Sequence, residues 1–257
     1  MSIINWLDLV FLFIIILFGL RGGSSGLFTG IINIAGLIGS FWAATRYYIR
    51  VARWLTDEWG WADSLASLIK PLIKLPEPFN NPEVLSLPVK LLNQISGQIP
   101  LPSPWPDIIS YLNQLGPNRS VGEAMNLLLA QGLLKLMVFI VLFLVVRAAL
   151  KFIGAILMGI LSFTPLGPIN RLGGLGLGLA AGVILVGILI AILVPLQIPL
   201  ALMGAQGILS TLNEGIQTSM IINTLSPLVK EWGVIPNLFP ELNANFLKQY
   251  FRFGTEV

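Results

Sequence analysis

Long apolar stretches, two of them carrying glycines at four-residue spacing, constrain this chain more than any other feature. This GxxxG spacing places glycines on one side of a helix. In lipid such a stripe lets a second helix approach closely, because packing drives helix association there. The chain is therefore expected to be a bundle of membrane helices with two packing stripes, made of Gly22, Gly26 and Gly30 in the first and Gly174, Gly178 and Gly182 in the second.

The composition favours a membrane protein over a soluble one. Hydrophobic residues make up 55% of the 257 residues and charged residues only 11%, whereas a soluble domain carries about 25% charged residues. Several stretches approach the roughly 20 apolar residues that cross a bilayer. We expect an all-α fold, an integral membrane bundle of about four transmembrane helices with additional interfacial amphipathic helices.

The residue types that are missing exclude several kinds of chemistry. The sequence contains no cysteine and no histidine, which excludes disulfides, thiol nucleophiles and histidine-based catalysis or metal binding. No phosphate-loop motif and no paired carboxylates at membrane depth are found. The net charge of +3 is too small to indicate nucleic-acid binding. We expect no enzyme and no cofactor, with membrane lipids as a partner.

Two transmembrane hairpins describe the organisation of the chain. In the first, a polar turn at Arg21–Gly26 is predicted between spans at about 6–20 and 27–44. In the second, Pro195 is expected to end the last span. Ten prolines between residues 71 and 117 prevent long regular elements there. The predicted segments are hairpin 1 (1–48), a Pro-rich extramembrane or interfacial segment (49–127), hairpin 2 (128–195) and an amphipathic C-terminal segment (196–257).

Shorter helices are predicted outside the spans. Residues 51–75 have the pattern of an amphipathic helix on the membrane surface, with Trp54, Trp59 and Trp61 as interface anchors. Further helices are expected at 84–95 and 106–115. Residues 149–163 are expected to bend away from the third span, and the last twenty residues to form a loose tail.

Basic residues predict an orientation. Lys and Arg in short loops mark the cytoplasmic side, and one side of the predicted bundle collects four of them without a nearby carboxylate. This basic face sets topology and attracts anionic lipids, or alternatively docks a partner protein. Both termini would then lie on the opposite side, although Arg46, Arg50 and Arg53 argue for the reverse. The basic face comprises Arg21, Arg147, Lys151 and Arg171.

More than one role is possible for one carboxylate and for the glycine stripes. Asp8 lies near the start of the first span, where we expect an ion pair with Lys135 or hydration rather than a coupling role. The glycine stripes are expected to pack within the chain, and a homo-oligomer contact is the alternative.

Two motifs with arginine and glycine resemble the colicin V production protein (CvpA) family. The first is Asn5–Asp8 followed by an apolar run to Gly19–Gly22, and the second is Gly167–Gly174 before a glycine-rich span. The resemblance covers about residues 4–55 and 130–225. It implies a multi-pass protein of the bacterial inner membrane with about four spans and no catalytic residues.

The function that this resemblance implies is non-enzymatic support of peptide-toxin production or export, or of envelope homeostasis, through helix–helix assembly. Both termini would be periplasmic, and an internal membrane is the alternative location. The chain has Ser24 and Ser25 where the family usually has basic residues, and Ala180–Ala181 where it commonly has an arginine. A small oligomeric channel or transporter is the alternative function, although polar groups inside the spans are few, mainly Asn33 and Gln131.

Overall fold

The computed structural model describes residues 4–72, 82–96, 109, 112–160, 167–202 and 208–231. These ranges are helical almost throughout, and within them the structure contains no strand beyond an isolated bridge between Pro88 and Ser120. The predicted all-α fold is therefore confirmed.

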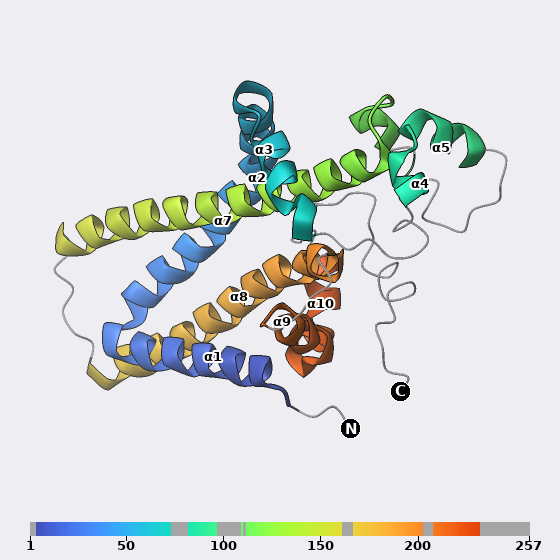
Figure 1. The fold of residues 1–257 in the computed structure, drawn as a ribbon. Helices are drawn as coiled ribbons and strands as arrows, with labels where there is room; N and C mark the ends of the chain where they lie inside the picture. Colours follow the sequence, from blue (N-terminus) through green and yellow to red (C-terminus); the bar gives the residue numbers. More distant parts are fainter. Residues whose placement is uncertain are drawn as a thin grey trace. The chain divides into compact units, whose positions relative to one another are not determined.

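Four helices in the described ranges are long and apolar enough to cross a membrane (Figure 1). They are α1 (Trp6–Ser25), α2 (Leu27–Trp59), α7 (Val121–Ile160) and α8 (Gly167–Leu202). Their number agrees with the predicted four spans. The shorter elements are α3 (Trp61–Ile69), η1 (Lys70–Leu72), α4 (Pro82–Ser86), α5 (Val89–Ser96), α9 (Ile208–Thr218) and α10 (Met220–Glu231).

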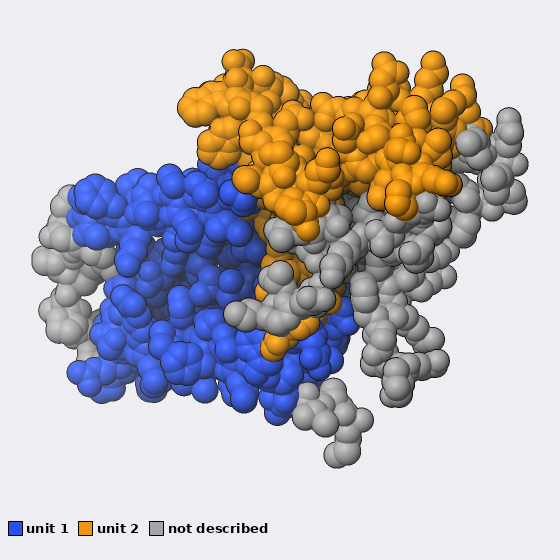
Figure 2. Space-filling view, in the orientation of Figure 1, with its two compact units in different colours: residues 1–49, 137–194, 214–236 blue, residues 50–136, 195–213, 237–257 orange. Residues whose placement is uncertain are grey.

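The chain divides into two compact units (Figure 2). Unit 1 comprises residues 1–49, 137–194 and 214–236, and unit 2 comprises residues 50–136, 195–213 and 237–257. Helices α2, α7 and α8 each contribute residues to both units. All of α1 belongs to unit 1.

In unit 1, α1 packs antiparallel against α8, and α2 packs antiparallel against α7. Gly22 of α1 lies against Gly174 of α8, whereas Ile15, nearer the start of α1, lies against Gly182. Gly154 of α7 lies against Ile32 of α2. Gly39, further along α2, lies against Leu150, which comes earlier in α7. These pairs are visible as neighbouring helices in Figure 1.

An aromatic cluster fastens α2 to α7 in unit 1. The ring of Phe139 is fully buried and makes edge-to-face contacts with Phe41 and Tyr48, at centroid distances of 5.6 and 5.9 Å. Such pairs contribute roughly 0.5–1.5 kcal/mol each beyond the area they bury. The cluster therefore fixes which face of α7 meets α2.

Unit 2 is held by main-chain hydrogen bonds near the start of α7. The N–H of Val121 donates to the carbonyl of Leu87 at 2.9 Å, and the N–H of Val89 donates to the carbonyl of Arg119 at 3.0 Å. Arg119 also forms an ion pair with Asp63 at 3.1 Å. Because both side chains are well exposed, this pair contributes little to stability.

The predicted turn at Arg21–Gly26 is wrong, because α1 continues to Ser25 and only Gly26 separates it from α2. The hydroxyl of Ser24 donates to the carbonyl of Arg21 at 2.8 Å, so this polar residue satisfies the helix rather than ending it. Gly26 adopts a φ of +83°, which a residue with a side chain rarely adopts. A single glycine thus replaces the expected six-residue turn.

Three other helices extend beyond their predicted ends. Helix α2 passes Ala44 and reaches Trp59, and α7 continues as one uninterrupted helix to Ile160. Helix α8 passes Pro195 and reaches Leu202. In apolar surroundings a helix is the conformation that satisfies its own backbone, and one proline removes only one N–H group from that pattern. The helices therefore also cross the predicted segment boundaries at 48/49, 127/128 and 195/196.

Two predicted helices are divided where the backbone requires it. Gly60, at a φ of +64°, separates α2 from α3 within the predicted helix 51–75. Pro88 separates α4 from α5 within the predicted helix 84–95, because proline restricts the residue before it and lacks an N–H group. Of the predicted helix 106–115, residues 112–115 are helical and most others lie outside the described residues, as does the predicted tail.

Candidate functional site

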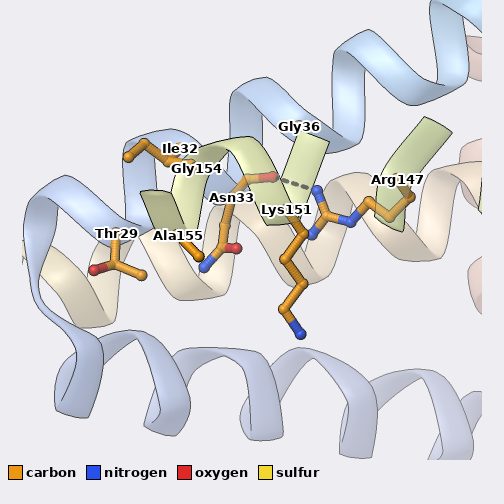
Figure 3. Close-up of a pocket in the computed structure, with 8 residues that line it drawn as sticks. All are labelled: Thr29, Ile32, Asn33, Gly36, Arg147, Lys151, Gly154 and Ala155. Carbon is orange, nitrogen blue, oxygen red and sulfur yellow. Dashed lines mark hydrogen bonds between the residues drawn. The ribbon is translucent and has the colours of Figure 1, made fainter. Parts of the chain in front are cut away.

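A pocket between α2 and α7 of unit 1 holds two basic residues of α7 (Figure 3). Its volume is about 220 Å³. Helix α2 contributes Thr29, Ile32, Asn33 and Gly36, and helix α7 contributes Arg147, Lys151, Gly154 and Ala155. We call it the Arg147 pocket. In the orientation of Figure 1, Figure 2 shows unit 1 hollowed between α7 and α1.

Arg147 reaches across the pocket to the main chain of α2. Its Nη1 donates to the carbonyl oxygen of Asn33 at 2.8 Å, and Figure 3 shows the guanidinium directed at this atom. A Cβ atom on Gly36 would lie 2.8 Å from Nη1, so the glycine leaves the space through which the arginine passes. Gly154 similarly leaves space for Ile32, with 2.7 Å between its ideal Cβ position and Cγ2.

Three other polar side chains of the Arg147 pocket have no partner within the part of the chain that the structure describes. Among the described residues, no hydrogen bond or ion pair involves the side chains of Thr29, Asn33 or Lys151. In the view of Figure 3, the ammonium of Lys151 extends away from the contact between Arg147 and Asn33. The lining residues thus offer positive charge and hydrogen-bond donors and include no carboxylate.

A second polar cluster joins the start of α1 to α10. Asp8 is only 3% exposed, and its Oδ1 accepts from the Ser219 hydroxyl at 2.6 Å and from the N–H of Ile221 at 3.1 Å. Its Oδ2 accepts from the N–H groups of Met220 and Asn5, both at 3.1 Å. The carboxylate therefore caps the N-terminus of a helix far away in the sequence.

Asn5 and Trp6 complete this cluster at α9. The amide of Asn5 donates to the carbonyl of Gly215 at 2.7 Å and to the hydroxyl of Thr218 at 2.9 Å. The indole of Trp6 packs on Gly215, whose ideal Cβ position lies 2.9 Å from ring atoms. The motif Asn5–Asp8 thus positions the junction of α9 and α10, and its polar groups are used structurally.

The two glycine stripes meet each other inside unit 1. A Cβ on Gly22 would collide with the carbonyl oxygen of Gly174, and one on Gly178 would collide with that of Phe18. Gly182 also lies against the backbone of Ile15. Helices α1 and α8 therefore touch backbone to backbone, and Gly22 belongs to this contact as a helical residue rather than a turn residue.

The remaining stripe glycines are Gly26, between α1 and α2, and Gly30, in the first turns of α2. Gly30 packs against Leu177 of α8, and Gly26 packs against the amide of Asn170. All six predicted packing glycines are buried, and these contacts are made within one chain.

The structure divides the four residues of the predicted basic face. Arg147 and Lys151 line the pocket, whereas Arg21, near the end of α1, and Arg171, near the start of α8, are exposed and outside it. The predicted pair of Asp8 and Lys135 joins residues of different units and stays a prediction. The donors to Asp8 described above are all groups of unit 1.

Ser219 and Asn170 are two helix-capping residues that sequence reasoning missed. Ser219 directly precedes α10 and accepts from the N–H of Ile222 at 3.1 Å, which is ordinary N-cap behaviour. A serine before an amphipathic stretch was a local signal for this cap. No local signal connects it with Asp8, because 211 positions separate the two residues.

Comparison with protein families agrees with this arrangement of helices. The profile of the family described as colicin V production protein matches residues 7–75 and 108–226. Comparison with curated proteins and with solved structures gives no match. The unmatched interval 76–107 falls within the proline-rich segment. Because the matched residues include nearly all of the four spanning helices and the junction of α9 and α10, this multi-pass membrane chain belongs to the colicin V production protein family.

Proposed function

We propose that this protein is a non-enzymatic accessory protein of the bacterial inner membrane, which supports peptide-toxin production or export, or envelope homeostasis. The observation that carries the proposal is the family match over most of a chain with four apolar spanning helices. Helix–helix assembly with another membrane protein is the mechanism by which such a chain would act.

The exposed apolar faces of α1 and α7 are the surfaces that this mechanism would use. Phe13 of α1 is 64% exposed, and Phe152 of α7 is 69% exposed. The glycine stripes are occupied by contacts within the chain. A partner helix would therefore approach across the exposed apolar faces, where lipid chains would otherwise lie.

Photocrosslinking in cells tests the proposal. A photoreactive phenylalanine analogue replaces Phe13 or Phe152, and the matched controls replace the buried Phe11 and Phe139 of the same helices. We expect Phe13 or Phe152 to yield a discrete crosslinked membrane protein and the buried positions to yield none. Crosslinks to lipid alone at both exposed positions would contradict assembly with a partner.

The orientation that we propose places both termini and the proline-rich residues 71–117 in the periplasm. The exposed basic residues Arg21 and Arg171, near the ends of their helices, support this orientation through the positive-inside rule. The proline-rich segment would then offer a second contact surface to periplasmic or envelope components.

A small oligomeric channel or transporter is a second candidate, which the Arg147 pocket favours. Unpaired positive charge at membrane depth is typical of solute and ion pathways. Anion flux into liposomes containing the purified protein distinguishes the two functions. Flux that Lys151→Gln reduces would favour the channel, whereas liposomes as tight as protein-free ones would favour the accessory protein.

A further inference from the structure

We propose that the Arg147 pocket is a binding site for a phosphate group that carries net negative charge. The inference is independent of the proposed function, because it depends only on the residues that line the pocket. Two cations of α7, one turn apart, and the polar side chains of Asn33 and Thr29 line the same pocket. These are the groups with which proteins hold phosphate oxygens.

Charge is the first argument for a ligand of this class. Neither Arg147 nor Lys151 forms an ion pair with any carboxylate in the described parts of the chain. Both residues lie within the apolar span Val121–Ile156. Charged side chains at such depth are costly and usually pair with an opposite charge. An anion bound in the pocket would supply the negative charge that no carboxylate of the described residues provides.

Unused hydrogen-bonding groups are the second argument. One N–H of Arg147 binds the carbonyl of Asn33, and a guanidinium has five N–H groups. The bond holds the arginine in place at the pocket wall, so that its other donors are available without further ordering. The side-chain amide of Asn33 and the hydroxyl of Thr29 have no partner among the residues described.

Size and depth fit a phosphate group. The volume of about 220 Å³ exceeds the roughly 30 Å³ that one water molecule takes up in the liquid. Asn33 lies six residues after the start of α2, which corresponds to about 9 Å along the helix axis. A hydrocarbon core is about 30 Å thick, and a depth of about 9 Å is less than half of that thickness, so Asn33 lies in the half of the membrane where α2 begins. A lipid headgroup or a free phosphate can reach that depth.

Retention of anionic lipid by the full-length protein tests the site. The protein is reconstituted in nanodiscs of phosphatidylcholine with or without phosphatidylglycerol, and bound lipid is counted by native mass spectrometry. We expect retention of phosphatidylglycerol to fall about tenfold in Lys151→Gln, since a charged hydrogen bond is lost. The matched control Arg21→Gln removes an exposed charge of the same unit outside the pocket and should retain the lipid.

A second variant separates binding from folding. Asn33→Leu removes the side-chain amide but keeps the main-chain carbonyl that Arg147 contacts, so the packing of α2 on α7 should persist. We expect weaker lipid retention at an unchanged unfolding temperature. Equal losses in Lys151→Gln and Arg21→Gln would overturn the proposal, because they would indicate diffuse attraction by surface charge.

Inorganic phosphate distinguishes the two sources of the ligand. It is titrated calorimetrically into protein in nanodiscs of phosphatidylcholine alone. A heat of binding that Lys151→Gln abolishes identifies free phosphate as the ligand. No heat, together with retention of phosphatidylglycerol, identifies the lipid headgroup. Absence of both the heat and a preference for phosphatidylglycerol overturns the proposal.

Discussion

The side-chain oxygen of Asn170 accepts a hydrogen bond from the backbone N–H of Leu27 at 2.8 Å. Leu27 is the first residue of α2, where no carbonyl of the same helix is available to this N–H group. Asn170 belongs to α8, so one spanning helix caps another at the single-residue break of Gly26. This contact fixes the two helix starts against each other.

Asn170→Ala should therefore destabilise unit 1 by about 1 kcal/mol, the usual value of an N-cap. Thermal unfolding of the purified protein in detergent measures the change. Asn170→Asp keeps the acceptor oxygen and should retain most of the stability. Equal losses in both variants would show that the amide packs on Gly26 rather than acting as a cap.

Gly178→Ala should destabilise the protein by about 1–3 kcal/mol, as overpacking of a close contact does. Its Cβ would collide with the carbonyl oxygen of Phe18 and lie 3.0 Å from the Cα of Gly19, and neither backbone atom can move away cheaply. The matched control is Gly176→Ala on the same helix, because nothing lies within 4 Å of its Cβ position. Thermal unfolding and oligomer size in detergent are measured together. A change of oligomer size at unchanged stability would instead assign the stripe to contacts between chains.

Asp8→Ala should loosen α10 without unfolding the spans. The substitution leaves the N–H groups of Met220 and Ile221 and the hydroxyl of Ser219 without their acceptor. Loss of a cap of this kind corresponds to about tenfold faster amide hydrogen exchange in the first turn of α10. Hydrogen–deuterium exchange measures it. Asp57→Ala, which removes an exposed carboxylate of α2, should leave this exchange unchanged.

A reporter fused after Val257 should give a periplasmic signal if the proposed orientation is right. The reason is that four spans place both termini on one side, opposite the side rich in Lys and Arg. A fusion at Gly26, between α1 and α2, serves as the cytoplasmic counterpart. Signals exchanged between the two fusions would reverse the orientation, and Arg46, Arg50 and Arg53 would then mark the cytoplasmic side.

The sequence by itself determined the class of the protein, because that class depends on local properties. Length and apolarity of each stretch specify helices that cross a membrane. The motifs Asn5–Asp8 and Gly167–Gly174 carried the resemblance to the family whose profile matches the chain. Helix ends were predicted less well. The residues Ser24 and Pro195 weaken a helix in water, yet α1 and α8 pass through them, since lipid leaves the backbone no partner other than itself.

Only the tertiary structure decided which distant groups meet. It paired Gly22 with Gly174, and Asp8 with Ser219. It also placed Arg147 on the carbonyl of Asn33, inside a pocket rather than on the face of a loop. Such contacts depend on the register and facing of helices separated by more than a hundred residues, which is set by the packing of all the side chains between them. No local pattern in the sequence contains that information.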